Sequence, residues 1–494
     1  MAEGHGIFVV NLECSALEPD QLVVASMEGR EEISRPFEFR FIVTPRDEVP
    51  LLFEDFDAIL AGTATASFGP DGEHPIHGAI RAIRLLPIGH GGEAAYELRF
   101  VPRFVDTQLT RGSWIYQEKT PEEIIKDAFA LGGDAALADG DDFELQLEGQ
   151  YLPREYVVQY EESLFDFISR QAEHWGIFYF FDHLAETDKL VFADMNTAFP
   201  QLEGFESIGF ESRTGTTITE SVRAIGARQR VIEAQVSLRD YNYRIPSVQL
   251  VTALTPVDGD GTGDVHVTGD HFWTPDEGAM LAMIRGQELF THKRRMWAKS
   301  TVRGLRAGHR FTLTGAEPEM HGMAREYIVV AIHHHYHSGS EANADALPYS
   351  NELELLPYEV VFRPPRLTRK PKIAGVMHAK IDSEADDDEV NVPCDEWGRY
   401  KVVMPFDVAG TTGGKSTCWI RMATSAGGSG YGFAQGLHVN TEVLIFHVDG
   451  DPDRPVIAGA VGNFEQPSEV RRENANQLTM ASRQGIRLVF NDAK

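Results

Sequence analysis

Alternation of hydrophobic and polar residues predicts short β-strands along much of the chain. The clearest run is residues 37–43, FEFRFIV, in which three phenylalanines alternate with Glu38 and Arg40. The same period recurs in 77–86 and 95–102, and turn-forming residues separate these runs. A period of two puts one side of a strand in a core and the other in solvent. The N-terminal part of the chain is therefore predicted to be a meander of antiparallel strands.

Two helix starts carry the same local signature. A threonine is followed by proline and, three positions after the threonine, by glutamate, at Thr120 to Glu123 and again at Thr274 to Glu277. This is the pattern of an N-cap, a proline in the first turn and a capping box. The first helix is predicted to stop at Gly132. The second is predicted to span 275–299, with basic residues at its end that suit the helix dipole.

A third helix is predicted directly after Ser163, which can cap it. Its inward side would be a stripe at helical spacing, formed by Leu164, Phe167, Ile168, Gln171 and Trp175. Gly176 would end the helix, and the apolar run 177–181 would form the next strand.

Two distant stretches share the order strand, polar loop, strand, proline. The first contains Ala82-Ile83, Glu97-Leu98 and Pro102, and the second contains Ala331-Ile332, Glu352-Leu353 and Pro357. We interpret this as a weak internal repeat, which favours two similar β-barrels in one chain.

The C-terminal part contains two specific turn motifs. The first is DEWGRYKVVMPFD at 395–407, a polar turn followed by an alternating strand, and the second is GDPDRPVIAGAVGN at 450–463, a tight reversal followed by an apolar strand. Short strand-like runs and a glycine-rich loop, 426–432, lie between them. Several short strands closed by turns are typical of a small barrel such as an OB-fold.

Together these motifs resemble the barrel domain of VgrG proteins, the spike components of type VI secretion, which are related to hub and tail-spike proteins of contractile phage baseplates. Residues 157–181 are also similar to a family arrangement: a Gln-Tyr pair, a capped helix ending in an acid and glycine, and an aromatic strand. The resemblance implies structural roles for Gln159, Tyr160, Ser163, Gly176, Asp395, Gly398, Arg399, Gly450, Asp451, Pro452, Arg454, Pro455, Gly459 and Asn463.

The fold that follows is mainly β with a few helices (α+β). It comprises two hub-type β-barrels with an intervening helical segment, then an OB-fold barrel, then the start of a triple-stranded β-helix. The expected boundaries are 1–118 for the first hub barrel, 119–200 for the helix-containing domain, 201–365 for the second hub barrel with its helix 275–299, 366–465 for the OB-fold barrel, and 466–494 for a linker and the start of the β-helix.

The resemblance also implies partners. Family hubs are homotrimers whose two barrels per subunit offer a near-sixfold ring to a hexameric tube protein. A needle tip protein and effectors or adaptors are expected at the spike end, together with baseplate proteins and a transient contact with the target membrane. Two alternatives remain open: a baseplate hub-spike of a phage-tail-like contractile particle, and a spike-linked hydrolase.

The amino-acid composition of the chain limits which classes of partner it can bind and the compartment in which it is expected to fold. Acidic residues outnumber basic ones 75 to 45, for a net charge of −30, so no nucleic-acid partner is expected. No apolar run approaches the ~20 residues of a membrane helix. The N-terminus, MAEGHGIFVV, lacks the pattern of a secretory signal peptide, so we expect assembly in the cytoplasm and, from the resemblance, export by the contractile machine. The three cysteines fit neither a disulfide framework nor a zinc site.

Two patterns resemble metal sites. His333, His335 and His337 would share one face of a strand, but alternate residues lie ~7 Å apart, too far for one ion, so a polar strand face is predicted. The run DGDGTGD, residues 258–264, resembles a calcium loop, but position twelve is Gly269 rather than an acid, so a flexible loop is predicted.

Hydrolase chemistry is the remaining alternative. The chain has no G-x-S-x-G motif for a serine nucleophile. A lysozyme-type domain with paired carboxylates would not fit between Asn463 and the needle-like segment 477–492. We therefore expect no catalytic, cofactor-binding or metal residues and no cofactor.

Overall fold

The computed structural model describes residues 10–46, 49–69, 72–87, 94–183, 186–211, 220–253, 255–338, 348–384 and 392–492. The expectation of no signal peptide rests on residues 1–10, most of which lie outside these ranges. The chain forms two compact units. The large unit comprises 1–110, 125–150 and 164–369, and the small unit comprises 111–124, 151–163 and 370–494.

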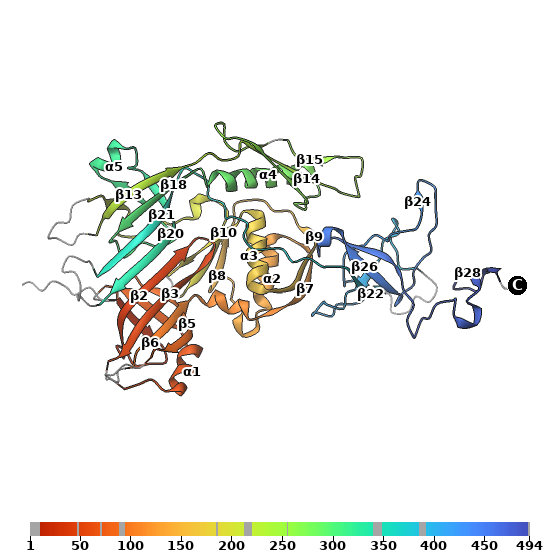
Figure 1. Cartoon of the computed structure of the whole chain (residues 1–494), viewed down its shortest axis with the longest axis horizontal. Helices are drawn as coiled ribbons and strands as arrows, with labels where there is room; N and C mark the ends of the chain where they lie inside the picture. Colours follow the sequence, from red (N-terminus) through yellow and green to blue (C-terminus); the bar gives the residue numbers. More distant parts are fainter. Residues whose placement is uncertain are drawn as a thin grey trace, which may run out of the picture. The chain divides into compact units, whose positions relative to one another are not determined.

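A twelve-stranded sheet dominates the large unit (Figure 1). Its main order is β1 (Val10–Cys14), β4 (Ala64–Phe68), β5 (Ile76–Leu85), β6 (Tyr96–Val101), β3 (Arg35–Pro45), β2 (Leu22–Glu32), β20 (Glu326–His337), β21 (Tyr349–Pro357), β18 (Arg294–Ser300) and β13 (Val222–Gln229). Strand β19 (Arg310–Thr314) pairs with both β20 and β12 (Ser207–Gly209).

The sheet consists of two halves with the same strand order, although β1 pairs antiparallel with β4 whereas β12 pairs parallel with β19. The first half has the order β1-β4-β5-β6-β3-β2 and the second β12-β19-β20-β21-β18-β13, and in each half the six strands occur in the same sequence along the chain. Even a bulge recurs: Ile83 pairs with Leu98 beside a register shift at Ile80/Ala82, and Ile332 pairs with Leu353 beside one at Val329/Ala331. The interpretation as an internal repeat is confirmed.

Burial follows the alternation read from the sequence. Phe37, Phe39 and Phe41 are at most 1% exposed, whereas Glu38 is partly exposed and Arg40 is exposed. The phenylalanine side of β3 packs against Phe100 of β6, with ring centroids 5.6–6.1 Å apart. The opposite side of β3 carries Glu38 and Arg40, and Glu38 lies 2.8 Å from Arg99 of β6.

Smaller elements complete the large unit. One sheet joins β10 (Phe178–Asp182), β11 (Lys189–Ala193) and β8 (Phe143–Gln146), and another joins β14 (Gln235–Asp240) to β15 (Leu250–Val251), β16 (Thr255–Pro256) and β17 (Asp264–Thr268). The longer helices are α1 (Phe53–Ala61), α2 (Pro121–Ala130), whose first turn belongs to the small unit, α3 (Leu164–Trp175) and α4 (Pro275–Phe290); α5 (Ala316–Met320) is short.

The helix starts are as predicted. Thr120 and Glu123 exchange the hydrogen bonds of a capping box, at 2.8 and 3.2 Å, and Thr274 Oγ1 accepts from the Glu277 N–H at 3.2 Å. Every residue of the predicted inward stripe of α3 is buried. Gly176 follows α3 with φ +69°, the left-handed conformation that ends helices.

The predicted end of the second helix is wrong. Helix α4 ends at Phe290, not near 299, and Arg294 begins β18. Strand β18 lies between β13 and β21, so its backbone groups are satisfied on both sides by the sheet. Because this pairing is long-range, it overrides the helical pattern of the local sequence.

The small unit is also mainly β. Strands β23 (Lys401–Val403), β22 (Val376–Asp382), β26 (Glu442–His447) and β27 (Pro455–Ala460) form one sheet in this order. Strands β7 (Arg111–Lys119) and β9 (Arg154–Ser163) form a two-stranded ribbon, and β24 (Gly427–Gly428) with β25 (Tyr431–Gly432) and β28 (Gln477–Ala481) with β29 (Arg487–Asn491) form hairpins. The predicted class, mainly β with a few helices, is confirmed.

The β7–β9 ribbon is grouped differently from our expectation. Residues 111–118 were expected in the first hub barrel and 151–163 in the intervening domain, but both belong to the small unit. The reason is packing: Ile115 lies against the core of the β22–β27 sheet, and Ser113 C=O accepts from the Val408 N–H at 3.0 Å. The other expected boundaries remain predictions.

None of the helices in the described ranges combines the length and the apolar character needed to cross a bilayer. Cys14, Cys394 and Cys418 are free thiols.

Candidate functional site

The strongest sequence motif, 450–455, forms the turn between β26 and β27. Gly450 has φ +75°, and a Cβ there would lie 3.2 Å from the carbonyl oxygen of Ile373. Backbone bonds from Asp451 N–H to Val448 C=O, 3.0 Å, and from Arg454 N–H to Asp451 C=O, 2.9 Å, close the turn. Glycine, aspartate and proline at these positions supply the conformations that such a reversal requires.

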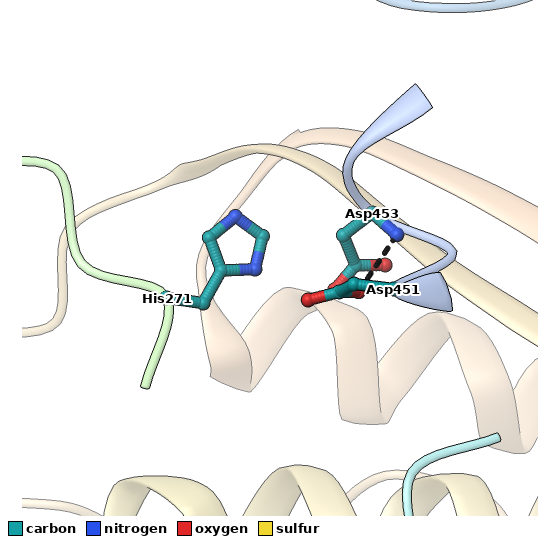
Figure 2. A group of neighbouring side chains, drawn as sticks. All are labelled: His271, Asp451 and Asp453. Atoms are coloured by element: carbon teal, nitrogen blue, oxygen red, sulfur yellow. Dashed lines mark hydrogen bonds between the residues drawn. The ribbon is translucent and has the colours of Figure 1, made fainter. Parts of the chain in front are cut away.

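Both aspartates of this turn bind one lysine. Lys370 Nζ lies 2.5 Å from Asp451 Oδ1 and 2.6 Å from Asp453 Oδ2. The backbone N–H of Asp453 also donates to Asp451 Oδ1 at 3.0 Å, the dashed contact in Figure 2. His271, also labelled there, belongs to the large unit. The lysine offsets the repulsion between two neighbouring carboxylates, which makes their burial possible.

Asp453 makes a second contact, to strand β9. Its Oδ1 accepts the backbone N–H of Val158 at 2.7 Å, in a buried position. The Asp453 side chain is 5% exposed, so both of its oxygens are used inside the protein. One carboxylate therefore joins the β26–β27 turn, Lys370 and the β7–β9 ribbon. We call Val158, Lys370, Asp451 and Asp453 the aspartate junction.

Burial shifts the pKa values of two side chains near the aspartate junction, His447 and Tyr156. Burial lowers the pKa of His447 to about 4, against the opposing effect of Asp451 and Asp453. Burial also raises the pKa of Tyr156 well above its usual range. These two side chains are therefore uncharged at neutral pH.

The Gln-Tyr motif lies on the same ribbon, next to the aspartate junction. Gln159 is fully buried: its Oε1 accepts from the Tyr116 hydroxyl at 3.3 Å, and its Nε2 donates to the Glu162 carbonyl at 3.1 Å. The ring of Tyr160 meets that of Phe406 edge-on, with centroids 5.4 Å apart. Ser163 is buried at the end of β9. Two motif stretches far apart in the chain thus meet in one small unit.

The 395–399 turn is a second local structure built from motif residues. Asp395 Oδ1 accepts from the N–H groups of Arg399, 2.8 Å, and Trp397, 3.0 Å, and Oδ2 lies 2.7 Å from Arg399 Nε. Burial alone would raise the pKa of Asp395, but these hydrogen bonds prevail and the pKa lies below its usual value. Gly398 supplies the left-handed conformation, φ +70°.

The remaining motif residues shape the chain around the barrel. Pro452 is buried in the turn, Arg454 Nε lies 3.8 Å from Asp451 Oδ2, and Pro455 begins β27 opposite His447. Gly459 pairs with Leu444 at a register shift. Asn463 Nδ2 donates to Glu442 Oε2 at 2.7 Å. Gly176 is the exception, because it lies in the large unit and is not part of this cluster.

Sequence reasoning missed two residues of the aspartate junction. Val158 contributes only its backbone N–H, so its side chain gives no signal. Lys370 belongs to neither of the two turn motifs, although it binds both aspartates. A buried Asp-Pro-Asp turn needs a nearby cation, and that requirement could have pointed to it.

The structure gives the positions of the residues in the two metal-like patterns, 333–337 and 258–264. His333, His335 and His337 are exposed on β20, and among the described residues none of them belongs to a group of three or more possible metal ligands. His334 points into the core, where Nε2 lies 2.8 Å from Glu31 Oε1 and Nδ1 lies 2.8 Å from the Tyr349 hydroxyl. Asp258 binds Lys293 Nζ at 2.6 Å. Asp264 begins β17.

Comparisons with known proteins agree with this architecture. Residues 30–340 match the family described as phage tail baseplate hub (GPD), and 394–461 match the type VI secretion system/phage-baseplate injector OB domain. The chain is 30% identical to the type VI secretion system spike protein VgrG1a of Pseudomonas aeruginosa, over 96% of this chain and 73% of that protein.

A second relative matches over only part of its own length. The actin cross-linking toxin VgrG1 of Vibrio cholerae is 28% identical over 91% of this chain, but the match spans only 41% of the toxin. Among solved structures, the E. coli c3393 protein, a component of the type VI secretion system similar to phage T4 tail proteins gp27 and gp5, aligns with a TM-score of 0.66 and 22% identity over 91% of this chain and all of that one. The predicted OB-fold is thereby confirmed, and the chain belongs to the VgrG family of spike proteins.

Proposed function

We propose that this chain forms the hub, barrel and spike root of a homotrimeric spike in a type VI secretion machine. It closes the end of a hexameric tube, contacts baseplate proteins, carries a tip protein with effectors or adaptors, and crosses the target membrane transiently during injection. It catalyses no reaction on other molecules. Assembly takes place in the cytoplasm, and the contractile machine exports the spike.

The β28–β29 hairpin carries the homotrimer proposal. Its paired residues Leu478 with Phe490 and Met480 with Leu488 place four apolar side chains on one face, each 45–64% exposed. A two-stranded hairpin is marginal in water without a cover for such a face. Two further copies of the same hairpin provide an identical apolar face by symmetry, as at the root of a triple-stranded β-helix.

The aspartate junction supports the mechanical role. A spike driven by a contracting sheath must transmit thrust without bending between its parts. The contacts of Asp453 with Val158 and Lys370 fasten two other chain segments of the small unit to one turn. In addition, Gln117 Nε2 donates to the Lys415 carbonyl at 2.8 Å, so the ribbon is held at a second place.

Light scattering coupled to size exclusion tests the assembly. At micromolar concentration we expect three times the 55.0 kDa of one chain. Leu488→Asp buries a charge in the proposed contact and should shift the population toward smaller species. Gln477→Asp is the matched control, since Gln477 lies on the opposite face of β28 and the variant should remain trimeric. A monomeric wild-type chain would refute the trimer.

Two assays test the absence of catalysis. Purified protein should release no soluble fragments from peptidoglycan, and metal analysis should find less than one equivalent of metal per chain. Activity together with stoichiometric metal would favour the spike-linked hydrolase instead.

A phage-tail-like particle is the second candidate, favoured by the match of 30–340 to the phage baseplate hub family. Electron microscopy separates the two. Free contractile particles carrying this chain in culture supernatants would support the phage-like candidate, whereas loss of tube-protein export on deletion of the gene would support secretion.

A further inference from the structure

Lys370 is the amine of the aspartate junction, and it contacts two carboxylates at once. Its Nζ lies 2.5 Å from Asp451 Oδ1 and 2.6 Å from Asp453 Oδ2. An oxygen in such close contact places the carboxyl carbon of Asp451 roughly 3–3.5 Å from Nζ, the separation of a near-attack arrangement. A nucleophile, an electrophile and a second carboxylate therefore already lie where an amide-forming step requires them.

The two aspartates differ in their contacts, and this gives them different roles. The Asp453 side chain is 5% exposed, and the Val158 N–H binds its Oδ1 at 2.7 Å, so its Oδ2 is the oxygen that faces Lys370. Asp451 Oδ1 accepts the backbone N–H of Asp453 at 3.0 Å, which polarises the Asp451 carboxyl group toward attack. These contacts favour Asp451 as the electrophile and Asp453 as the group that moves protons.

Two further side chains near the junction, Tyr156 and His447, make the surroundings poor at solvating charge. Both are buried, and burial keeps both uncharged at neutral pH. Among the described residues, neither the Tyr156 hydroxyl nor either ring nitrogen of His447 has a hydrogen-bond partner. Charged groups cost more free energy in such surroundings than in water. Condensation of the lysine with one aspartate reduces the three charged groups of the junction to one.

We propose that Lys370 and Asp451 condense after folding to an intramolecular isopeptide bond, with Asp453 as the proton relay. The Lys370 ammonium gives a proton to Asp453 Oδ2, and the neutral amine attacks Cγ of Asp451. A bond forms between Nζ and Cγ, and one Cγ–O bond breaks. The departing oxygen takes two of the three ammonium protons, both relayed by Asp453, and leaves as water. The third proton stays on the amide nitrogen, and no further reactant is consumed.

The folded chain supplies what a lysine and an aspartate free in water lack. Well-oriented groups within one molecule reach effective concentrations of about 10⁵–10⁸ M, which no bimolecular encounter approaches. In the unfolded chain Lys370 and Asp451 are far apart, and this advantage is absent. The bond is therefore expected only in chains that have folded.

The bond changes how the small unit carries force along the chain. It closes a covalent ring from 370 to 451, which contains the strands from β22 to β26. A pull along the chain then passes through the side-chain amide, and the strands inside the ring carry none of it. This inference goes beyond the proposed function and does not depend on it, because the step requires only the fold of the small unit.

The chain contains a matched lysine–aspartate pair that lacks the relay. Lys293 Nζ lies 2.6 Å from Asp258 Oδ1, and Asp260 again stands two positions after the first aspartate. The Asp260 side chain, however, is 96% exposed, and its Oδ2 lies 4.0 Å from Nζ, too far for direct proton transfer. Lys293 and Asp258 should therefore remain an ion pair, which makes them an internal control in every digest.

Mass spectrometry of the denatured full chain tests the bond. The wild type should weigh one water molecule less than its sequence, and a tryptic digest should contain peptide 370–372 joined to peptide 422–471. The joined peptides distinguish the isopeptide from dehydration within one peptide, such as succinimide formation. No peptides should be joined through Lys293 and Asp258. A folded wild-type chain that keeps the full mass of its sequence overturns the proposal.

Three variants assign the roles. Lys370→Arg keeps the cation and Asp451→Ala removes the electrophile, and both should keep the full mass of their sequences. Asp453→Asn keeps an oxygen for the Val158 N–H but loses the relay, so the joined peptides should form at least about 100-fold more slowly after cell-free synthesis. An unchanged rate in Asp453→Asn overturns the relay. Loss of ammonia instead of water in this variant would place the bond on residue 453 and overturn the assigned roles.

The outcomes separate the isopeptide from the proposed function. Because the bond lies within one chain, wild type and Lys370→Arg should have the same oligomer mass by light scattering. A trimer whose chains keep their full mass overturns the isopeptide and leaves the proposed function standing. A monomer whose chains have each lost one water supports the isopeptide and overturns the trimer.

Discussion

The Oδ1 atom of Asp453 accepts a 2.7 Å hydrogen bond from the backbone N–H of Val158, 295 residues earlier in the chain. This bond links the Gln-Tyr stretch to the Gly-Asp-Pro-Asp turn, the two most distinctive sequence motifs in the small unit. It is buried and charge-assisted, so the donor would lose a strong partner if the carboxylate were removed.

Asp453→Ala should loosen the aspartate junction. The change leaves the Val158 N–H buried without its acceptor, a cost of about 2 kcal/mol, so this amide should exchange with deuterium roughly thirty times faster. Hydrogen exchange followed by mass spectrometry over 151–163 measures it. Asp449→Asn, an exposed residue of the same turn, should leave the exchange unchanged. Unaltered exchange in Asp453→Ala would mean that the bond does not hold β9.

Gly176→Ala should destabilise the large unit more than a glycine change elsewhere. A Cβ at Gly176 would lie 2.6 Å from Ile284 Cγ2, in addition to the strain of φ +69°. Gly204 has a similar φ, +76°, but open space around it, so Gly204→Ala isolates the backbone cost of about 1 kcal/mol. We expect a clearly lower melting temperature for Gly176→Ala than for Gly204→Ala; equal values would show that Ile284 can move aside.

Glu173 should protect the proline-rich link, residues 363–373, from protease. Its Oε2 accepts from the backbone N–H groups of Leu367 and Thr368 at 2.9 and 2.8 Å, and its Oε1 accepts from the Thr368 hydroxyl at 2.9 Å. Without these bonds the link gains freedom, so Glu173→Ala should be cut by trypsin after Arg366 and Arg369 faster than the wild type. Glu203→Ala, at an exposed site, is the control. Resistance of Glu173→Ala would indicate that other contacts hold the link.

Stability should fall with acid because of buried histidines. Burial lowers the pKa of His183 to about 3, and it also lowers that of His309 and His334. Such groups are neutral in the folded protein but gain protons in the unfolded chain below pH ~6.5, so the stability present above this pH is lost as the pH falls toward the folded pKa. The expected slope is up to about 1.4 kcal/mol per pH unit for each histidine.

His183→Gln separates this effect from general acid unfolding. In the wild type, His183 Nδ1 accepts a hydrogen bond from the backbone N–H of His77 at 3.1 Å. The side-chain oxygen of glutamine can accept the same bond, but glutamine does not titrate. The decrease in stability between pH 6.5 and 4 should be shallower in this variant than in His337→Gln, which changes an exposed histidine. Chemical denaturation at several pH values provides the comparison, and identical slopes would show that His183 is protonated without cost.

The sequence pattern was sufficient to predict an element wherever its structure depends only on residues close by in the chain. The alternation in 37–43, the Thr-Pro-Glu helix starts and Gly176 as a helix end were all predicted, because each depends on side chains within a few residues. The repeat was also visible as paired dipeptides. Its meaning, one strand order used twice with the same bulge, required the pairing partners.

Helix α4 shows a case in which the local sequence pattern predicts the wrong structure. Residues 291–299 continue a helical and basic pattern, yet 294–300 form a central strand because β13 and β21 offer hydrogen bonds on both sides. Likewise, no nearby residue indicates that Lys370 binds two aspartates some 80 positions later, or that the N–H of Val158 needs Asp453. The sequence by itself determines the motifs and the type of each helix or strand, because these depend on residues that are neighbours along the chain. The tertiary structure decides which strands pair, which compact unit a segment joins and which cation a buried aspartate binds. These depend on contact energies between residues that are distant in the sequence and meet only in the folded chain.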